Sequence, residues 1–124
     1  MYKALIKSID PNVEEEVTVC VNGLELLGFV GYSPFVIEVG ETYEVSIEVT
    51  ILDEFNIREI EQHEKGFQRI GMGFAYLIRG VLLPGGIVDA GIELRDELFV
   101  DLTYLYNKYV EFRVDRLNLS FAKE

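Results

Sequence analysis

Residues 43–51 read YEVSIEVTI, a segment in which apolar and polar side chains alternate strictly. The apolar positions are Tyr43, Val45, Ile47, Val49 and Ile51, and polar residues fill the places between them. A period of two residues predicts a β-strand with one face in the core and the other in water. This segment therefore indicates a fold built mainly from half-buried strands.

The same alternation recurs on both sides of this segment. Residues 17–21 (VTVCV) and residues 110–115 (VEFRVD) predict two more strands of the same kind. After residue 115 the apolar positions move to Leu117, Leu119 and Phe121. We expect a β-bulge near Asp115 and Arg116, because an extra residue would turn the later side chains back toward the core.

Two hairpins are predicted from turn residues. Residues 74–83 (FAYLIRGVLL) are apolar on both faces, which predicts a central strand, and Gly80 is expected to mark a bend in it. Pro84-Gly85-Gly86 then predicts a turn, with residues 87–94 returning antiparallel. Asn22-Gly23 predicts a two-residue hairpin turn whose residues adopt positive φ.

Two stretches fit no single period. Residues 53–66 predict at most one short helix, which Gly66 would end. Residues 98–106 (LFVDLTYLY) fit both helical spacing and strict alternation. Val, Thr and Tyr favour pleated structure, so a strand or extended loop is expected there.

The whole pattern predicts one compact β domain. The chain has 124 residues, which is the usual size of one domain, and it contains no repeat or linker. We therefore expect a single domain over residues 1–124. Its predicted class is mainly β, a small antiparallel barrel or sandwich with at most one short helix.

A late hairpin and a final strand, in residues 80–94 and 109–119, resemble the corresponding part of OB-fold-like β-barrel domains. The likeness covers roughly a third of the chain. It implies binding of single-stranded nucleic acid or oligosaccharide through aromatic stacking in a positively charged groove. The residues that could supply such a face are Arg79, Arg113 and Arg116 with Tyr104, Tyr106 and Tyr109.

The charge of the chain departs from that family pattern. There are 22 acidic and 11 basic residues, and the formal net charge is −11. Residues 1–62 carry thirteen carboxylates and only three basic side chains. A body of this charge repels nucleic acid and anionic membranes, so a nucleic-acid partner is disfavoured.

The acidic residues are the candidate partner-binding site. Glu14, Glu15 and Glu16 precede one predicted strand, and Glu41, Glu44 and Glu48 lie in or beside another. If these strands are neighbours, their carboxylates form one patch that attracts a basic protein. The alternative is that the charge serves solubility alone.

Catalytic and metal sites are not expected. His63 with Glu59, and Asp89 with Glu93, are the acid–base pairs that the sequence offers, but neither has a nucleophile or further ligands nearby. The glycines form no phosphate-binding motif. Cys20 stands alone among valines and is expected to be an inert, half-buried small side chain. We therefore expect no catalytic residues, no metal and no cofactor.

The sequence predicts a non-enzymatic acidic binding module that recognises a basic protein partner. In charge and size it resembles the immunity proteins that neutralise basic nuclease toxins. The alternatives are a small-ligand-binding β-barrel and a structural subunit of a homo-oligomer.

No apolar run approaches the roughly 20 residues of a membrane span, and residues 1–11 lack the apolar core of a secretory signal. A cytoplasmic location is therefore expected.

Overall fold

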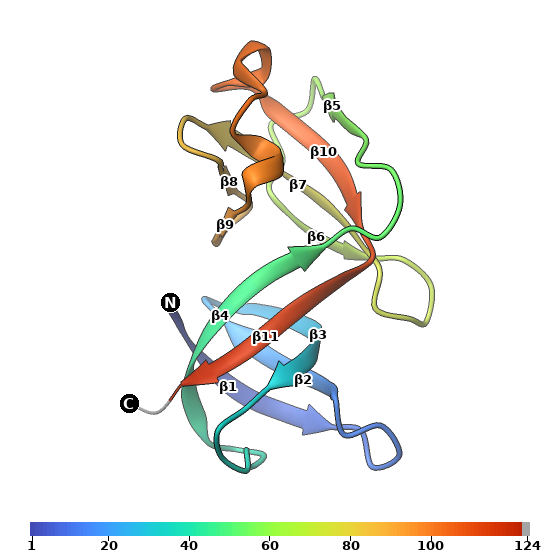
Figure 1. Cartoon of the computed structure of the whole chain (residues 1–124), viewed down its shortest axis with the longest axis vertical. Coiled ribbons are helices and arrows are strands. Elements are labelled where there is room, and N and C mark those ends of the chain that lie inside the picture. Colours follow the sequence, from blue (N-terminus) through green and yellow to red (C-terminus); the bar gives the residue numbers. More distant parts are fainter. Residues whose placement is uncertain (123–124) are drawn as a thin grey trace.

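The computed structural model describes residues 1–122 and has two parts, a closed barrel and a second sheet, which follow each other along the long axis (Figure 1). The strands are β1 Tyr2–Ile9, β2 Glu16–Val21, β3 Leu24–Tyr32, β4 Thr42–Thr50, β5 Ile57–Glu59, β6 Gly66–Arg69, β7 Tyr76–Leu83, β8 Ile87–Asp89, β9 Glu93–Arg95, β10 Tyr109–Val114 and β11 Arg116–Ala122. Two 3-10 helices, η1 Glu97–Phe99 and η2 Thr103–Leu105, complete the fold. The predicted class, mainly β with a small barrel, is confirmed.

Five strands form the barrel in the order β1-β2-β3-β11-β4, and β4 closes it by pairing with β1. Every pairing is antiparallel except that of β3 with β11. The β2–β3 hairpin turns at Asn22 and Gly23, whose φ angles are 50° and 79°. Both residues thus have the positive φ that the Asn-Gly pair predicts.

The second sheet is formed by residues that leave the barrel after β4 and return to it at β11. Its order is β5-β10-β7-β8-β9, with β6 also paired to β7. As predicted, β7 is central: β10 follows one of its edges, while β6 and β8 share the other. Gly80 lies where β6 ends and β8 begins, and a Cβ there would stand 2.4 Å from the carbonyl oxygen of Asp89.

At residue 115, where a bulge is predicted, the chain crosses from the second sheet to the barrel. The chain passes from β10 into β11 at Asp115, whose backbone N–H donates to the carbonyl of Thr50 at 2.8 Å. Its Oδ2 accepts from the backbone N–H of Leu52 at 2.6 Å. The apolar positions change phase where the chain passes from one sheet to the other.

One stretch forms no helix, and two local predictions are wrong. At residues 53–66, where at most one short helix is expected, the chain forms the strand β5 instead, and Phe55 packs against Phe99 of η1 and Phe112 of β10. Residues 98–106 form parts of the two 3-10 helices instead of a strand, and Asp96 caps the first by accepting from the N–H of Leu98. The strand expected over residues 87–94 is broken at Gly91, whose φ is 102°.

Side chains fill the interior of the barrel. Val17, Val19, Val45, Leu117 and Leu119 are completely buried. Packing is so close that a Cβ on Gly28 would lie 2.6 Å from Cγ of Leu119. The same apolar cluster continues into the second sheet.

Two tyrosines connect the barrel to the second sheet. The hydroxyl of Tyr76 on β7 accepts a hydrogen bond from the backbone N–H of Leu27 on β3 at 2.8 Å. The hydroxyl of Tyr2 on β1 accepts one from the N–H of Glu93 on β9 at 2.6 Å. Residues 80–94, part of the stretch that resembles an OB-fold, therefore lie in the second sheet and outside the barrel.

Candidate functional site

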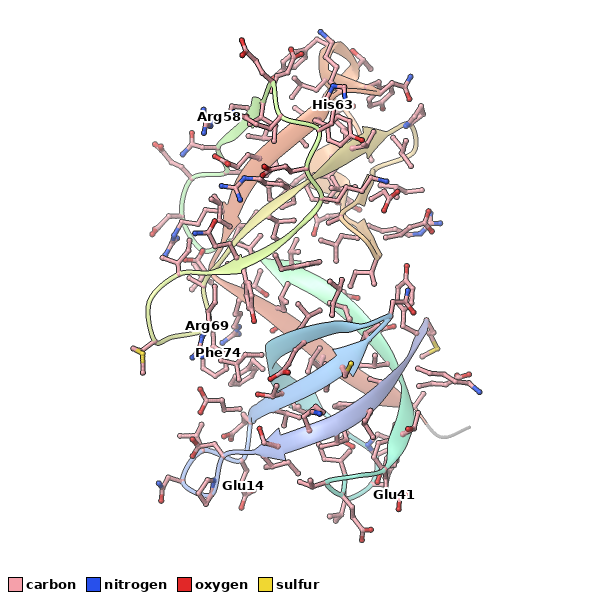
Figure 2. The ribbon with its side chains drawn as sticks, turned by 180° about the vertical axis from the view of Figure 1, so that it is seen from behind. Glu14, Glu41, Arg58, His63, Arg69 and Phe74 are labelled. Atoms are coloured by element: carbon pink, nitrogen blue, oxygen red, sulfur yellow. The ribbon has the colours of Figure 1, made fainter. Side chains whose placement is uncertain are left out.

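The six predicted site residues do not form one patch. Strand β1 lies between β2 and β4, so the strands carrying these glutamates are not neighbours. Glu14 and Glu15 lie in the β1–β2 turn, and Glu41 directly precedes β4. Figure 2 shows Glu14 and Glu41 at the same end of the barrel, the end away from the second sheet. The structure thus places Glu14, Glu15 and Glu41 at this free end, and Glu16 follows directly at the start of β2.

The other three glutamates have different neighbours. Glu44 stands opposite Lys3 in the β1–β4 register. Glu48 lines a groove of about 420 Å³ at the junction of the two sheets, together with Glu93 and Arg95. A hydrogen bond with the Asp10 side chain raises the pKa of Glu16. These positions separate Glu44 and Glu48 from the free end.

A groove of about 520 Å³ opens at the free end. It runs between the β1–β2 turn and the loop that joins β3 to β4, and we call it the end groove. Its lining is formed by Ile9, Glu14, Glu15, Val30, Ser33, Phe35, Val36 and Ile37. Val36 is 86% exposed, and Val13 and Val39 nearby in the same two loops are also exposed. The end groove is therefore an apolar surface bordered by carboxylates.

Both walls of the end groove are held in place by local contacts. On one side, Oδ1 of Asp10 accepts from the N–H groups of Asn12 and Val13, at 2.8 and 2.9 Å. These bonds hold the pKa of Asp10 below its ordinary value. On the other, the ring of Phe35 packs against Tyr43 with centroids 5.1 Å apart. A surface fixed in this way loses little conformational entropy when it binds a partner.

The apolar loop between β3 and β4 is not predicted from the sequence, because its residues show no periodicity. Residues 33–39 (SPFVIEV) are too short for a helix and contain a proline, so only their composition distinguishes them. Glu38 and Glu41 belong to the same loop, where the N–H of Glu41 donates to the carbonyl of Glu38 at 3.2 Å. The signal that could have found the site is this exposed apolar run beside acidic residues.

The acidic excess of residues 1–62 does not form one face. Asp53, Glu54, Glu59 and Glu61 belong to the segment of the second sheet, whereas Glu14 and Glu41 lie at the opposite end of the barrel. The charge asymmetry along the chain is therefore divided between the two parts of the molecule.

His63 and Asp89, one member of each acid–base pair that the sequence offers, make other contacts in the structure. His63 stacks on Tyr109 with ring centroids 4.6 Å apart. Asp89 forms an ion pair with Lys65 at 2.7 Å, and this bond lowers the pKa of Asp89. Within residues 1–122, no cluster of three or more His, Cys, Asp or Glu side chains is arranged to hold a metal. Cys20 is half-buried on β2.

The arginines and tyrosines expected of a nucleic-acid face are dispersed. Arg79, Arg113 and Tyr109 lie on β7 and β10 of the second sheet. Arg116 instead places its guanidinium carbon 4.3 Å from the centre of the Phe29 ring. Tyr104 belongs to η2, and Tyr106 directly follows it. These residues form no continuous aromatic and basic groove.

Comparison with known proteins places the chain in a family. Residues 1–122 match the family described as "Uncharacterised conserved protein UCP019853", so the chain belongs to that family. No curated protein and no solved structure matches it. None of the helices in the described residues has the length and apolarity needed to span a membrane.

Proposed function

We propose that the protein is a non-enzymatic binding module whose end groove holds a basic segment of a protein partner. The observation that carries this proposal is the combination of exposed apolar residues with carboxylates on one fixed surface. Val36 and Phe35 offer an apolar contact, and Glu14 and Glu15 line the same groove. Apolar contact supplies affinity, while the charges favour a basic partner and speed its approach.

The chemistry of the end groove defines the partner segment. An apolar side chain would lie against Val36 and Ile37, and Lys or Arg residues beside it would face Glu14 and Glu15. The net charge of −11 adds long-range attraction for such a partner. Occlusion of phosphate-binding Lys and Arg residues on a nuclease toxin, as by an immunity protein, is one activity of this kind.

The alternative functions receive less support. Buried side chains such as Val19 and Leu119 occupy the barrel interior, which disfavours a small ligand held there. A homo-oligomer would be recognised by its mass in size-exclusion chromatography with light scattering.

The five-stranded closed barrel supports the proposed likeness to OB-fold domains, whereas the acidic end groove differs from their basic binding face.

The proposal is tested first by affinity capture from native cell extract at low salt and at about 0.5 M salt, where the Debye length is roughly 4 Å. A basic protein retained only at low salt is then purified. Its association rate is measured with the wild-type chain, with the double variant Glu14→Lys/Glu15→Lys and with Val36→Asp. We expect both variants to weaken binding at least tenfold.

The matched control is Glu61→Lys/Glu64→Lys. It changes the net charge by the same amount, but on exposed residues of the second-sheet segment. We expect this control to bind nearly as well as the wild type. Equal weakening by both double variants would show that only total charge matters. An empty capture at both salt concentrations would also contradict the proposal.

A further inference from the structure

The outward face of the second sheet carries a cluster of charged side chains around Glu111. Glu111 on β10 stands opposite Arg58 on β5 and Arg79 on β7. Nη2 of Arg58 donates to Oε1 of Glu111 at 2.6 Å, and Nε of Arg79 donates to Oε2 at 2.7 Å. One carboxylate therefore orients two guanidinium groups.

The cluster has an excess of positive charge. The hydrogen bonds from Arg58, followed by those from Arg79, hold the pKa of Glu111 below its ordinary value. Glu111 is thus ionised at neutral pH, and its single negative charge faces two positive ones. The side chain of Arg58 is 71% exposed, whereas that of Glu111 is only 10% exposed. The unused N–H groups of Arg58 remain accessible from solvent.

A groove of about 390 Å³ lies beside this cluster. It is lined by Asn56, Ile57, Arg58, Leu77, Glu111, Phe112 and Arg113. Arg113 follows Glu111 by two residues on β10, so both side chains are on the same face. Its side chain is 56% exposed, and Nη1 donates to Asp115 at 3.0 Å. Two exposed arginines therefore border a groove that also has apolar lining.

We propose that this groove binds a small organic anion. Its carboxylate or other oxyanion group lies between Arg58 and Arg113, and its apolar part packs over Leu77, which stands opposite Arg113 on the same face of the sheet. Guanidinium groups hold such oxyanions by paired, charge-assisted hydrogen bonds. The net negative charge of the protein does not prevent this contact, because at physiological salt it is screened over about 8 Å.

The site is independent of the end groove. It uses β5, β7 and β10, whereas the end groove uses the turns at the opposite end of the barrel (Figure 2). Sheet stability explains the bonds of Arg58 and Arg79 to Glu111. Arg113 takes no part in those bonds, because its hydrogen bond goes to Asp115.

The test is a titration of the full chain with sodium benzoate, a probe that has one carboxylate and one apolar ring. Binding is followed by NMR at the arginine Nε–H groups and at the Leu77 methyl groups. We expect saturable shifts at Arg58, Arg113 and Leu77. Inorganic phosphate, which offers an oxyanion without an apolar part, should bind at least several-fold more weakly.

Arg113→Gln is the main variant because it leaves the bonds to Glu111 in place. We expect it to weaken benzoate binding about tenfold, the loss of one charge-assisted contact. Leu77→Ala is a second variant that keeps every charge and should also weaken binding. Arg95→Gln on β9 removes the same charge from another groove and should leave the affinity unchanged.

Three results would overturn the proposal. The first is the absence of saturable shifts in the wild-type chain. The second is phosphate binding as tightly as benzoate, which would remove the role of the apolar lining. The third is an equal loss of benzoate affinity in Arg113→Gln and Arg95→Gln, which would show that binding depends only on the overall charge of the protein.

Discussion

Gly28 and Gly31 on β3 show how differently one residue type is used at two positions of a strand. At Gly28 the Leu119 side chain occupies the space of a Cβ, whereas nothing lies within 4 Å of the Cβ position at Gly31. Gly28→Ala should therefore destabilise the fold by about 1–3 kcal/mol through overpacking. Urea unfolding of the wild type and the variant measures this difference in the free energy of unfolding. Gly31→Ala is the control, and equal stability of the two variants would contradict the packing described around Leu119.

Glu111 is a charged residue that the fold buries between two arginines. Its pKa in the folded chain is lower than its ordinary value of 4.5, so its ionised form stabilises the fold above that pH. This contribution is lost as the pH falls below 4.5 and through the lowered pKa. Glu111→Gln should therefore cost about 1–3 kcal/mol at pH 7, and the difference from wild type should shrink in acid.

Unfolding curves of both chains between pH 7 and pH 3 measure this effect. Glu97→Gln, which changes an exposed side chain on η1, serves as the control and should differ little in stability from wild type. A deficit of Glu111→Gln that stays constant over the whole range would mean that its charge is not the cause.

Strands whose side chains alternate clearly are predictable from the sequence. Elements whose structure depends on contacts with residues far away in the chain are not. β4 was expected at residues 43–51 and lies at Thr42–Thr50, and the turn at Asn22 was also foreseen. Alternation identifies a buried face, but it does not say which core that face joins. The division into barrel and second sheet was therefore missed, although the phase change near Asp115 marks it.

The candidate site was predicted only in part for the same reason. Glu14 and Glu15 line the end groove and Glu41 lies at the same end of the barrel, whereas Glu48 lines a different groove. The apolar half of the site, formed by Phe35 and Val36, has no periodic pattern, and only its composition distinguishes it in the sequence. Strand order, which is set by long-range pairing, decides which side chains share a surface.

Strand β3 depends on a side chain from the other sheet. β11 pairs with β3 only from Phe29 onward, and the hydroxyl of Tyr76 accepts the N–H of Leu27 before that point. Tyr76→Phe would leave this buried N–H without a partner, at a cost of about 1–3 kcal/mol. Hydrogen exchange should show faster exchange of the Leu27 amide, whereas the exposed Tyr104→Phe should change nothing. Unchanged protection at Leu27 would contradict this role.

For the whole molecule, the shared core predicts a single unfolding transition. One apolar cluster extends from Val19 in the barrel to Phe112 in the second sheet, and Tyr2 and Tyr76 add hydrogen bonds between them. Circular dichroism in the near and far ultraviolet should give coincident curves, and the calorimetric and van't Hoff enthalpies should agree. Two separate transitions would show instead that residues 51–115 form an independent unit.

The position of β11 in the barrel also affects how the protein is made. This strand joins β3 to β4, yet it follows both in the sequence. While a ribosome is still adding the residues of the second sheet, the nascent chain can pair only β3, β2, β1 and β4 as an open sheet. Such a sheet has two unprotected edges, which invite pairing with other nascent chains. Translation speed through residues 51–115 and the availability of chaperones should therefore govern the yield of soluble protein.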